Sequence, residues 1–180
     1  MKKRYLFIGL MAISGFVNAQ VYIGQKGTTK LKGEAPQETV IAESSSLVGK
    51  LNLTSKKFNF KQALNTILFS RGDLQTKHAQ EEYFEVEKFP NATFSGEIIN
   101  DTDLSEDGTF HVTVSGKFSI HGVEKEMKMP AVITVQNGTA HITSKFTVFL
   151  SDFNIKIPRL MTAKVSPEFT VDISMKATKI

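Results

Sequence analysis

Apolar and polar residues alternate one by one over much of this chain, and this alternation restricts the fold to β-sheets with one buried face. The clearest run lies near the C-terminus, where single polar residues separate Phe169, Val171, Ile173, Met175 and Ala177. Successive side chains of a β-strand point to opposite faces, so such a run buries all its apolar residues together. The same period recurs at residues 92–98, 110–121, 127–135 and 140–150. The chain is therefore predicted to be all-β.

Turn residues separate these runs at intervals that suit an antiparallel meander of about eight strands. Asp107-Gly108 and Asn137-Gly138 are predicted hairpin turns, because Gly and Asn tolerate the positive φ of tight hairpins. His121-Gly122 and residues 54–57 mark two further turns. A sandwich and a closed barrel both fit this pattern, and periodicity alone does not choose between them.

Residues 73–85 break the pattern, since they lack alternation and contain few β-branched residues. Asp73 is a residue type that caps helices, so a short helix is predicted to begin there. Just before it, a strand that begins at Phe58 changes phase ahead of Ile67, which indicates a β-bulge. The expected fold is a β-domain with one short helical segment.

The first nineteen residues have the layout of a secretory signal peptide. Three cations among the first four residues precede an apolar run from Leu6 to Val17, and Val17-Asn18-Ala19 suits a signal peptidase. This run is too short for a hydrocarbon core of about 30 Å, which needs about 20 residues. We expect cleavage after Ala19 and an exported domain of residues 20–180. Its location would be the periplasm or the exterior, and it would have no transmembrane segment after cleavage.

Composition and motifs exclude several function classes. Of 22 Lys and Arg, three lie in the predicted signal peptide, which leaves 19 against 18 Asp and Glu and gives no argument for nucleic acid. The absence of Cys excludes disulfides, thiolate metal sites and Cys nucleophiles. The sequence contains no P-loop, Gly-x-Ser-x-Gly or His-Glu-x-x-His pattern. We therefore predict no catalytic residues, metal ligands or cofactor.

Phenylalanine supplies 14 of the 17 aromatic residues, and there is no Trp. Most of the Phe residues lie on the apolar faces of the predicted strands, close to two Met residues. Such side chains either fill an ordinary core or line a cavity suited to a lipid tail, because they make no demand for hydrogen bonds. Composition leaves both alternatives open.

Three segments, taken in order, resemble the YceI-like family of exported, lipocalin-like proteins. They are KHAQEEYFEVEKFPNATFSGEI at 77–98, VSGKFSIHGVEKEMKMP at 114–130 and SKFTVFLSDFNIKIP at 144–158. The first is similar to the family's His-containing segment with its Tyr-Phe, Lys-Phe-Pro and Thr-Phe sequences. The second resembles its Gly-Val-x-Lys run and the third its Asp-Phe-x-Ile stretch. The resemblance spans residues 47–175.

This resemblance implies an eight-stranded antiparallel, lipocalin-like barrel with a helical segment near one end. It also implies non-catalytic binding or carriage of a polyisoprenoid or other amphiphilic lipid in a long apolar channel. We expect the channel to be lined by Phe58, Phe60, Phe84, Phe94, Phe118, Met127, Met129, Phe146 and Phe169. Polar groups that could hold a headgroup are His78, Glu82 and Tyr83, with His78 and Glu82 four residues apart on one face of the predicted helix.

Two alternatives remain open. One is a structural or interaction module whose barrel is filled by its own side chains. The other is an enzyme that acts on a lipid headgroup through His78 with Glu82 or Asp152. A carrier needs a continuous cavity, a filled module has none, and an enzyme needs a polar cluster beside the cavity.

Overall fold

The computed structural model describes residues 20–180, and strands dominate this part of the chain. The predicted signal peptide, residues 1–19, lies outside the described residues. The strands are β1 Val21–Ala35, β2 Glu38–Asn52, β3 Lys57–Ala63, β4 Leu68–Phe69, β5 Asn91–Ile98, β6 Gly108–Ile120, β7 Val123–Gln136, β8 Thr139–Phe149 and β9 Glu168–Lys179. The helical elements are η1 Leu64–Thr66, α1 Asp73–His78, η2 Ala79–Tyr83, η3 Leu150–Phe153 and η4 Arg159–Met161.

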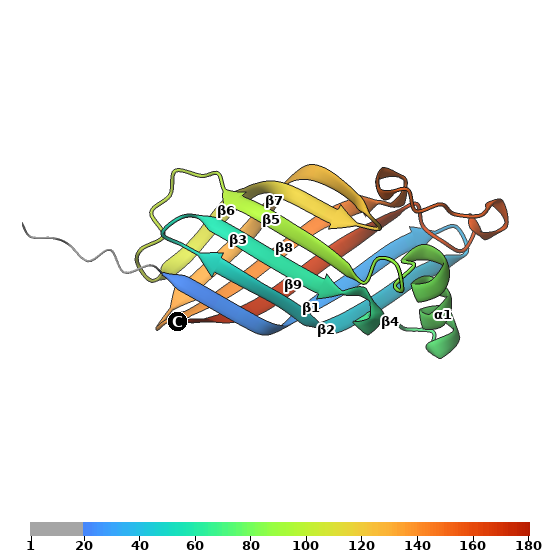
Figure 1. Ribbon diagram of the computed structural model, residues 1–180, viewed down its shortest axis with the longest axis horizontal. Coiled ribbons are helices and arrows are strands. Elements are labelled where there is room, and N and C mark those ends of the chain that lie inside the picture. Colours follow the sequence, from blue (N-terminus) through green and yellow to red (C-terminus); the bar gives the residue numbers. More distant parts are fainter. Residues whose placement is uncertain (1–19) are drawn as a thin grey trace, which may run out of the picture.

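Eight of these strands form a closed antiparallel barrel. The order around the sheet is β1-β9-β8-β7-β6-β5-β3-β2, and pairing of β1 with β2 closes it. The two-residue strand β4 adds to the outer end of β2 through the pair Ala42 and Phe69. Figure 1 shows an elongated barrel with α1 at one end and the C-terminus at the other. The all-β, barrel and short-helix predictions are confirmed, and the sandwich alternative is wrong.

Two of the predicted hairpin turns have the expected geometry. His121 and Gly122 have φ of 54° and 72°, and they join β6 to β7. Asn137 and Gly138, with φ of 49° and 72°, join β7 to β8. Positive φ at both central residues is characteristic of the type I′ turn, whose twist matches that of the flanking strands.

The prediction of a tight hairpin at Asp107-Gly108 is wrong. Residues 99–107 form a longer loop between β5 and β6, and Gly108 begins β6 without a positive φ. The carboxylate of Asp107 instead accepts a hydrogen bond from the backbone N–H of Asn137 at 2.9 Å. Asp107 therefore links this loop to the neighbouring β7–β8 hairpin, a role that local turn propensity does not reveal.

The bulge predicted ahead of Ile67 is also wrong. β3 ends at Ala63, and the 3₁₀ turn η1 changes the phase of the apolar residues before β4. α1 follows as predicted, but its N-cap is Gly72 and Asp73 makes no capping hydrogen bond. Gly72 has φ of 98°, which a residue with a Cβ adopts only with strain.

Candidate functional site

A cavity of about 530 Å³ runs along the inside of the barrel. This volume lies within the range of about 300–1,000 Å³ that is common for small-molecule sites. Its wall is mostly aliphatic and aromatic, and every barrel strand contributes to it, through Leu31, Val40, Phe60, Phe94, Phe118, Met129, Phe146 and Val171 among others. The barrel is therefore hollow, and the filled-barrel alternative does not describe this structure.

Phenylalanine rings from four strands form a continuous row along this wall. The ring centroids of Phe58 and Phe94 are 4.9 Å apart. Phe94 lies 6.3 Å from Phe118, and Phe118 lies 6.0 Å from Phe146. These separations are typical of favourable aromatic pairs. The row gives the cavity a smooth apolar surface without hydrogen-bonding groups.

The end of the barrel near the C-terminus is closed by apolar packing. Gly24 on β1 and Gly49 on β2 lie opposite each other. A Cβ on Gly24 would overlap the side chain of Met175, and one on Gly49 would overlap the ring of Phe60. Because the glycines leave this space free, Met175 packs into it beyond the cavity wall, and the ring of Phe60 lines the wall beside it. Leu104, from the loop before β6, is 2% exposed and belongs to the same apolar core as Met175 and Phe60.

The opposite end is the mouth of the cavity. Residues of α1 and of the segment 154–167 line it together with Glu38, which follows the β1–β2 turn, and Figure 1 shows the helix, the turn and the segment at one end of the barrel. A backbone hydrogen bond of 2.9 Å from Gln37 to Ala163 ties the turn to that segment. At the rim, Glu38 forms an ion pair of 2.8 Å with Arg71, and the side chain of Glu38 is only 8% exposed.

The helical segment places polar groups at this mouth, but in an unexpected combination. α1 continues into the π-helical turn η2, in which the N–H of Phe84 donates to the carbonyl of Ala79, five residues back, at 2.8 Å. A π turn brings residues five apart onto the same side. His78 and Tyr83 therefore both line the cavity. Burial, and then the charge of Glu82, raises the pKa of Tyr83.

The prediction that His78 and Glu82 share one face is wrong for the same reason. Glu82 lies beside a separate, polar hollow whose wall includes Glu85, His121 and Lys156. The spacing of four residues suits an α-helix, whereas the chain here has the wider π turn. Of the three predicted headgroup residues, His78 and Tyr83 line the cavity and Glu82 does not.

Most of the predicted lining residues do face the cavity. These are Phe58, Phe60, Phe84, Phe94, Phe118, Met129, Phe146 and Phe169. Met127 is the exception. Its partly buried side chain packs among the core residues of the barrel and is absent from the cavity wall.

A buried polar cluster interrupts the apolar wall on one side. The amide of Gln62 accepts a hydrogen bond from Thr29 at 2.8 Å and donates to Ser44 at 3.0 Å and Thr66 at 2.9 Å. Because these groups satisfy one another, the cluster holds η1 against β1 and β2 without the help of a ligand. Sequence reasoning missed this cluster and the aliphatic residues of β1 and β2 that line the cavity.

A second set of polar contacts anchors the helical segment outside the cavity. The two ring nitrogens of His121 lie 2.9 Å from Glu85 Oε1 and 3.1 Å from the carbonyl oxygen of Phe153. This hydrogen bond from His121 is the main reason that the pKa of Glu85 is lowered. His121 thus joins the end of the helical segment to the β6–β7 turn and to η3.

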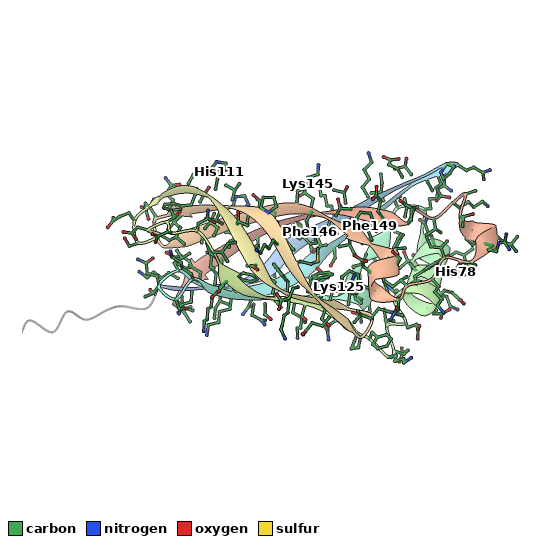
Figure 2. The ribbon with its side chains drawn as sticks, turned by 90° about the horizontal axis from the view of Figure 1, so that it is seen from above. His78, His111, Lys125, Lys145, Phe146 and Phe149 are labelled. Carbon is green, nitrogen blue, oxygen red and sulfur yellow. The ribbon has the colours of Figure 1, made fainter. Side chains whose placement is uncertain are left out.

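The geometry does not assemble the residues of the enzyme alternative. Asp152 forms an ion pair of 2.7 Å with Lys125 on β7 and is absent from the cavity wall. Figure 2 shows His78 at the mouth end of the molecule, well separated from Lys125. Among residues 20–180, no three His, Asp or Glu side chains gather in a group that could hold a metal. Nor does any helix of residues 20–180 have both the length and the hydropathy to cross a bilayer.

Comparison with known proteins gives a family and a set of similar folds. The profile of the family described as the YceI-like domain matches residues 17–177. No curated protein sequence matches the chain.

Three solved structures illustrate the structural likeness. A polyisoprenoid-binding domain from Saccharophagus degradans superposes with a TM-score of 0.76 at 13% identity, covering 91% of this chain and 100% of that chain. BcnA of Burkholderia cenocepacia gives 0.68 at 16%, covering 84% and 96%. A YceI protein of Campylobacter jejuni gives 0.57 at 16%, covering 100% and 99%. At these identities the likeness establishes a shared barrel fold.

Proposed function

The chain belongs to the YceI-like family, and we propose that it binds the hydrocarbon chain of an amphiphilic lipid or polyisoprenoid inside its barrel. One observation carries this proposal: an apolar cavity of about 530 Å³ that extends from a sealed end to an open mouth. Such a shape suits a long, flexible apolar ligand with one polar end. The polyisoprenoid-binding domain from Saccharophagus degradans has the same fold, which supports this class of ligand.

Burial of the hydrocarbon chain supplies the affinity in this proposal. Each buried CH₂ contributes about 0.8 kcal/mol, or about fourfold in the dissociation constant. The lipid would enter with its hydrocarbon tail towards Met175 and leave its polar end at the mouth. Polar side chains at the mouth also include Arg71, Gln75 and Lys164, and among them we assign His78 and Tyr83 to hydrogen-bond such a headgroup.

We propose further that the protein acts by binding alone, without chemistry on the ligand. The wall is dominated by apolar side chains, the Ser144 hydroxyl donates to the carbonyl of Pro130, and the polar cluster around Gln62 is occupied by its own hydrogen bonds. Binding and release are then the whole function. Replacing His78 by Ala is expected to weaken discrimination between headgroups and to leave binding of the hydrocarbon chain in place.

The proposed setting is the exported compartment, reached through cleavage after Ala19. Gln20, the first described residue, forms hydrogen bonds with Thr54 and Ser105, so the barrel begins directly after the proposed site. N-terminal sequencing of the protein from the exported fraction is expected to start at Gln20. An intact Met1 in that fraction would contradict the export proposal and leave the binding proposal untouched.

The ligand itself is tested by mass spectrometry of organic extracts from the purified protein. The proposal predicts a lipid with a long hydrocarbon chain in stoichiometric amount. Extracts of a variant with Phe118 replaced by Glu are the control, since an unpaired charge in an apolar cavity is strongly disfavoured. Extracts of folded wild-type protein that lack any amphiphile, even after incubation with a lipid mixture, would overturn the proposal.

A further inference from the structure

The segment 154–167 forms an exposed and folded projection at the mouth of the cavity (Figure 1). Its tip, η4, is held by backbone hydrogen bonds from Met161 to Pro158 at 2.8 Å and from Val165 to Met161 at 2.9 Å. The base is fixed by the bond between Gln37 and Ala163. The conformation of the tip is therefore determined by its own structure and by the barrel.

This folded tip presents a large apolar side chain to solvent. Leu160 is 94% exposed, the largest value among the exposed large apolar side chains of residues 20–180. Two further exposed leucines lie at the same end of the barrel: Leu74 on α1 at 69% and Leu68 on β4 at 61%. Single exposed apolar residues are common on protein surfaces, but several around one opening indicate an interaction site.

The charges of this segment favour an anionic partner. Lys156, Arg159 and Lys164 lie on it, and it contains no Asp or Glu. None of these three cations forms an ion pair with another part of residues 20–180. On the facing helix, by contrast, Lys77 is paired with Glu81. An exposed leucine flanked by free cations matches the boundary of an anionic bilayer, where phosphates lie above an apolar interior.

The position of the segment relates this surface to the cavity. Met161 and Lys164 line the cavity opening, and Leu74 lines it from α1. When Leu160 enters the headgroup region of a bilayer, the mouth of the cavity therefore lies next to the membrane. A ligand with a long hydrocarbon chain could then pass between bilayer and barrel with little exposure to water. Exposure of apolar surface to water costs about 25 cal/mol per Å².

We propose that the mouth of the barrel docks on an anionic lipid bilayer, with Leu160 inserted among the headgroups and Lys156, Arg159 and Lys164 against the phosphates. This docking rests on the proposed function for its purpose, because it connects the cavity to a source of lipid. It is physically independent of that function, because the three cations and Leu160 can bind a membrane whether or not the cavity is loaded.

Vesicle flotation tests the docking with the processed protein, residues 20–180. Wild type is expected to float with vesicles of equimolar phosphatidylcholine and phosphatidylglycerol and to remain behind with phosphatidylcholine alone. Replacing Leu160 by Ser should lower the partition coefficient about tenfold. Replacing Lys164 by Gln should lower it about fivefold. Because Leu160 is exposed, its variant should unfold at the wild-type temperature.

Matched controls lie at the closed end of the barrel. Ile99 is 48% exposed, and its replacement by Ser removes an exposed apolar side chain that faces no mouth. Lys57 is an exposed cation that begins β3, and its replacement by Gln removes the same charge as the Lys164 variant. Both controls are expected to float as wild type does. Equal losses of flotation in the control and mouth variants would overturn the proposal. Net charge or nonspecific hydrophobic adsorption would then explain the binding to vesicles.

A parallel titration in vesicle-free buffer separates this proposal from the proposed function. A soluble long-chain fluorescent amphiphile is expected to bind wild type and the Leu160 variant equally. Normal probe binding with no flotation would overturn the docking alone. Flotation that requires Leu160, with no probe binding, would support the docking and contradict the lipid-binding function. Equal flotation with neutral and anionic vesicles would refute the role assigned to the cations.

Discussion

Gly96 on β5 and Gly116 on β6 lie directly opposite each other, so close that a Cβ on either would overlap a backbone carbonyl oxygen of the other strand. The oxygens concerned belong to Ser115 and Ser95. Backbone, unlike the end of a side chain, cannot move aside without disturbing the ladder of hydrogen bonds. The glycine pair therefore permits the close approach of β5 and β6 in the wall of the barrel.

This contact predicts that replacing Gly116 by Ala destabilises the barrel by about 1–3 kcal/mol. Chemical denaturation of the processed protein measures the change. The control is Gly108 replaced by Ala on the same strand, where the nearest atoms to a Cβ belong to the ring of Phe110, at 3.2 Å or more. The control should be nearly neutral. Equal stability of the two variants would show that the close approach is not constrained as described.

The strands that carry strong alternation could be predicted from the sequence, and β1 and β2 show why the remainder could not. On β1, inward positions are occupied by Gly24, Gly27 and Thr29, so the apolar period disappears. Register shifts around Gly27 change the phase again. A glycine at an inward position is required by the side chains of distant strands that pack over it. The local sequence pattern does not contain that information.

The cavity wall was predictable to the extent that it consists of Phe on alternating strands. The mouth was not, because its geometry depends on the π turn after His78 and on the path of residues 154–167. A spacing of four residues indicated that His78 and Glu82 belong together, yet the turn paired His78 with Tyr83 instead. Such a turn is set by tertiary packing, here that of buried Phe84 and Ala79.

A pair of substitutions on β8 separates the cavity wall from the outer surface. Phe146 lines the cavity, whereas Phe149 is 48% exposed, and Figure 2 labels both. Replacing Phe146 by Leu removes ring volume from the wall and should shift binding towards longer or bulkier probes. The same change at Phe149 should leave probe preference unaltered. Titration with a series of amphiphiles of increasing length measures both, and identical profiles for the two variants would count against the assigned wall.

The polar cluster predicts a stability effect at Gln62. Replacing Gln62 by Ala leaves the buried Thr29 hydroxyl without its partner, which costs about 1–3 kcal/mol, whereas Ser44 keeps its hydrogen bond to Thr66. The matched control is Gln25 replaced by Ala, since Gln25 is exposed on β1. Thermal unfolding should show a clearly lower midpoint for the first variant only. Similar midpoints would mean that the cluster does not hold η1 against the barrel.

The contact between Glu85 and His121 predicts a dependence of stability on pH. The folded pKa of Glu85 lies below its ordinary value of 4.5, mainly because of the hydrogen bond from His121. A carboxylate whose pKa is lowered by folding stabilises the folded state fully at pH values above its ordinary pKa. This stabilisation is lost as the pH falls through the pKa of the folded state. Wild type should therefore lose thermal stability below about pH 4.5 more steeply than a variant with Gln in place of Glu85.

The control for this titration is Glu87 replaced by Gln, because Glu87 is exposed and forms no ion pair within residues 20–180. Glu34 and Asp103 also have lowered pKa values, so some acid sensitivity should remain in every variant. An acid profile of the Glu85 variant that coincides with that of wild type would exclude the carboxylate as the sensitive group.

The most direct test of the lipid-binding account is the affinity of wild-type protein for single-chain amphiphiles that differ only in chain length. Isothermal titration of residues 20–180 with such a series should show affinity rising about fourfold per CH₂ until the sealed end near Met175 stops further entry. Beyond that length the affinity should level off or fall. An affinity that is absent, or that does not change with chain length, would contradict the account.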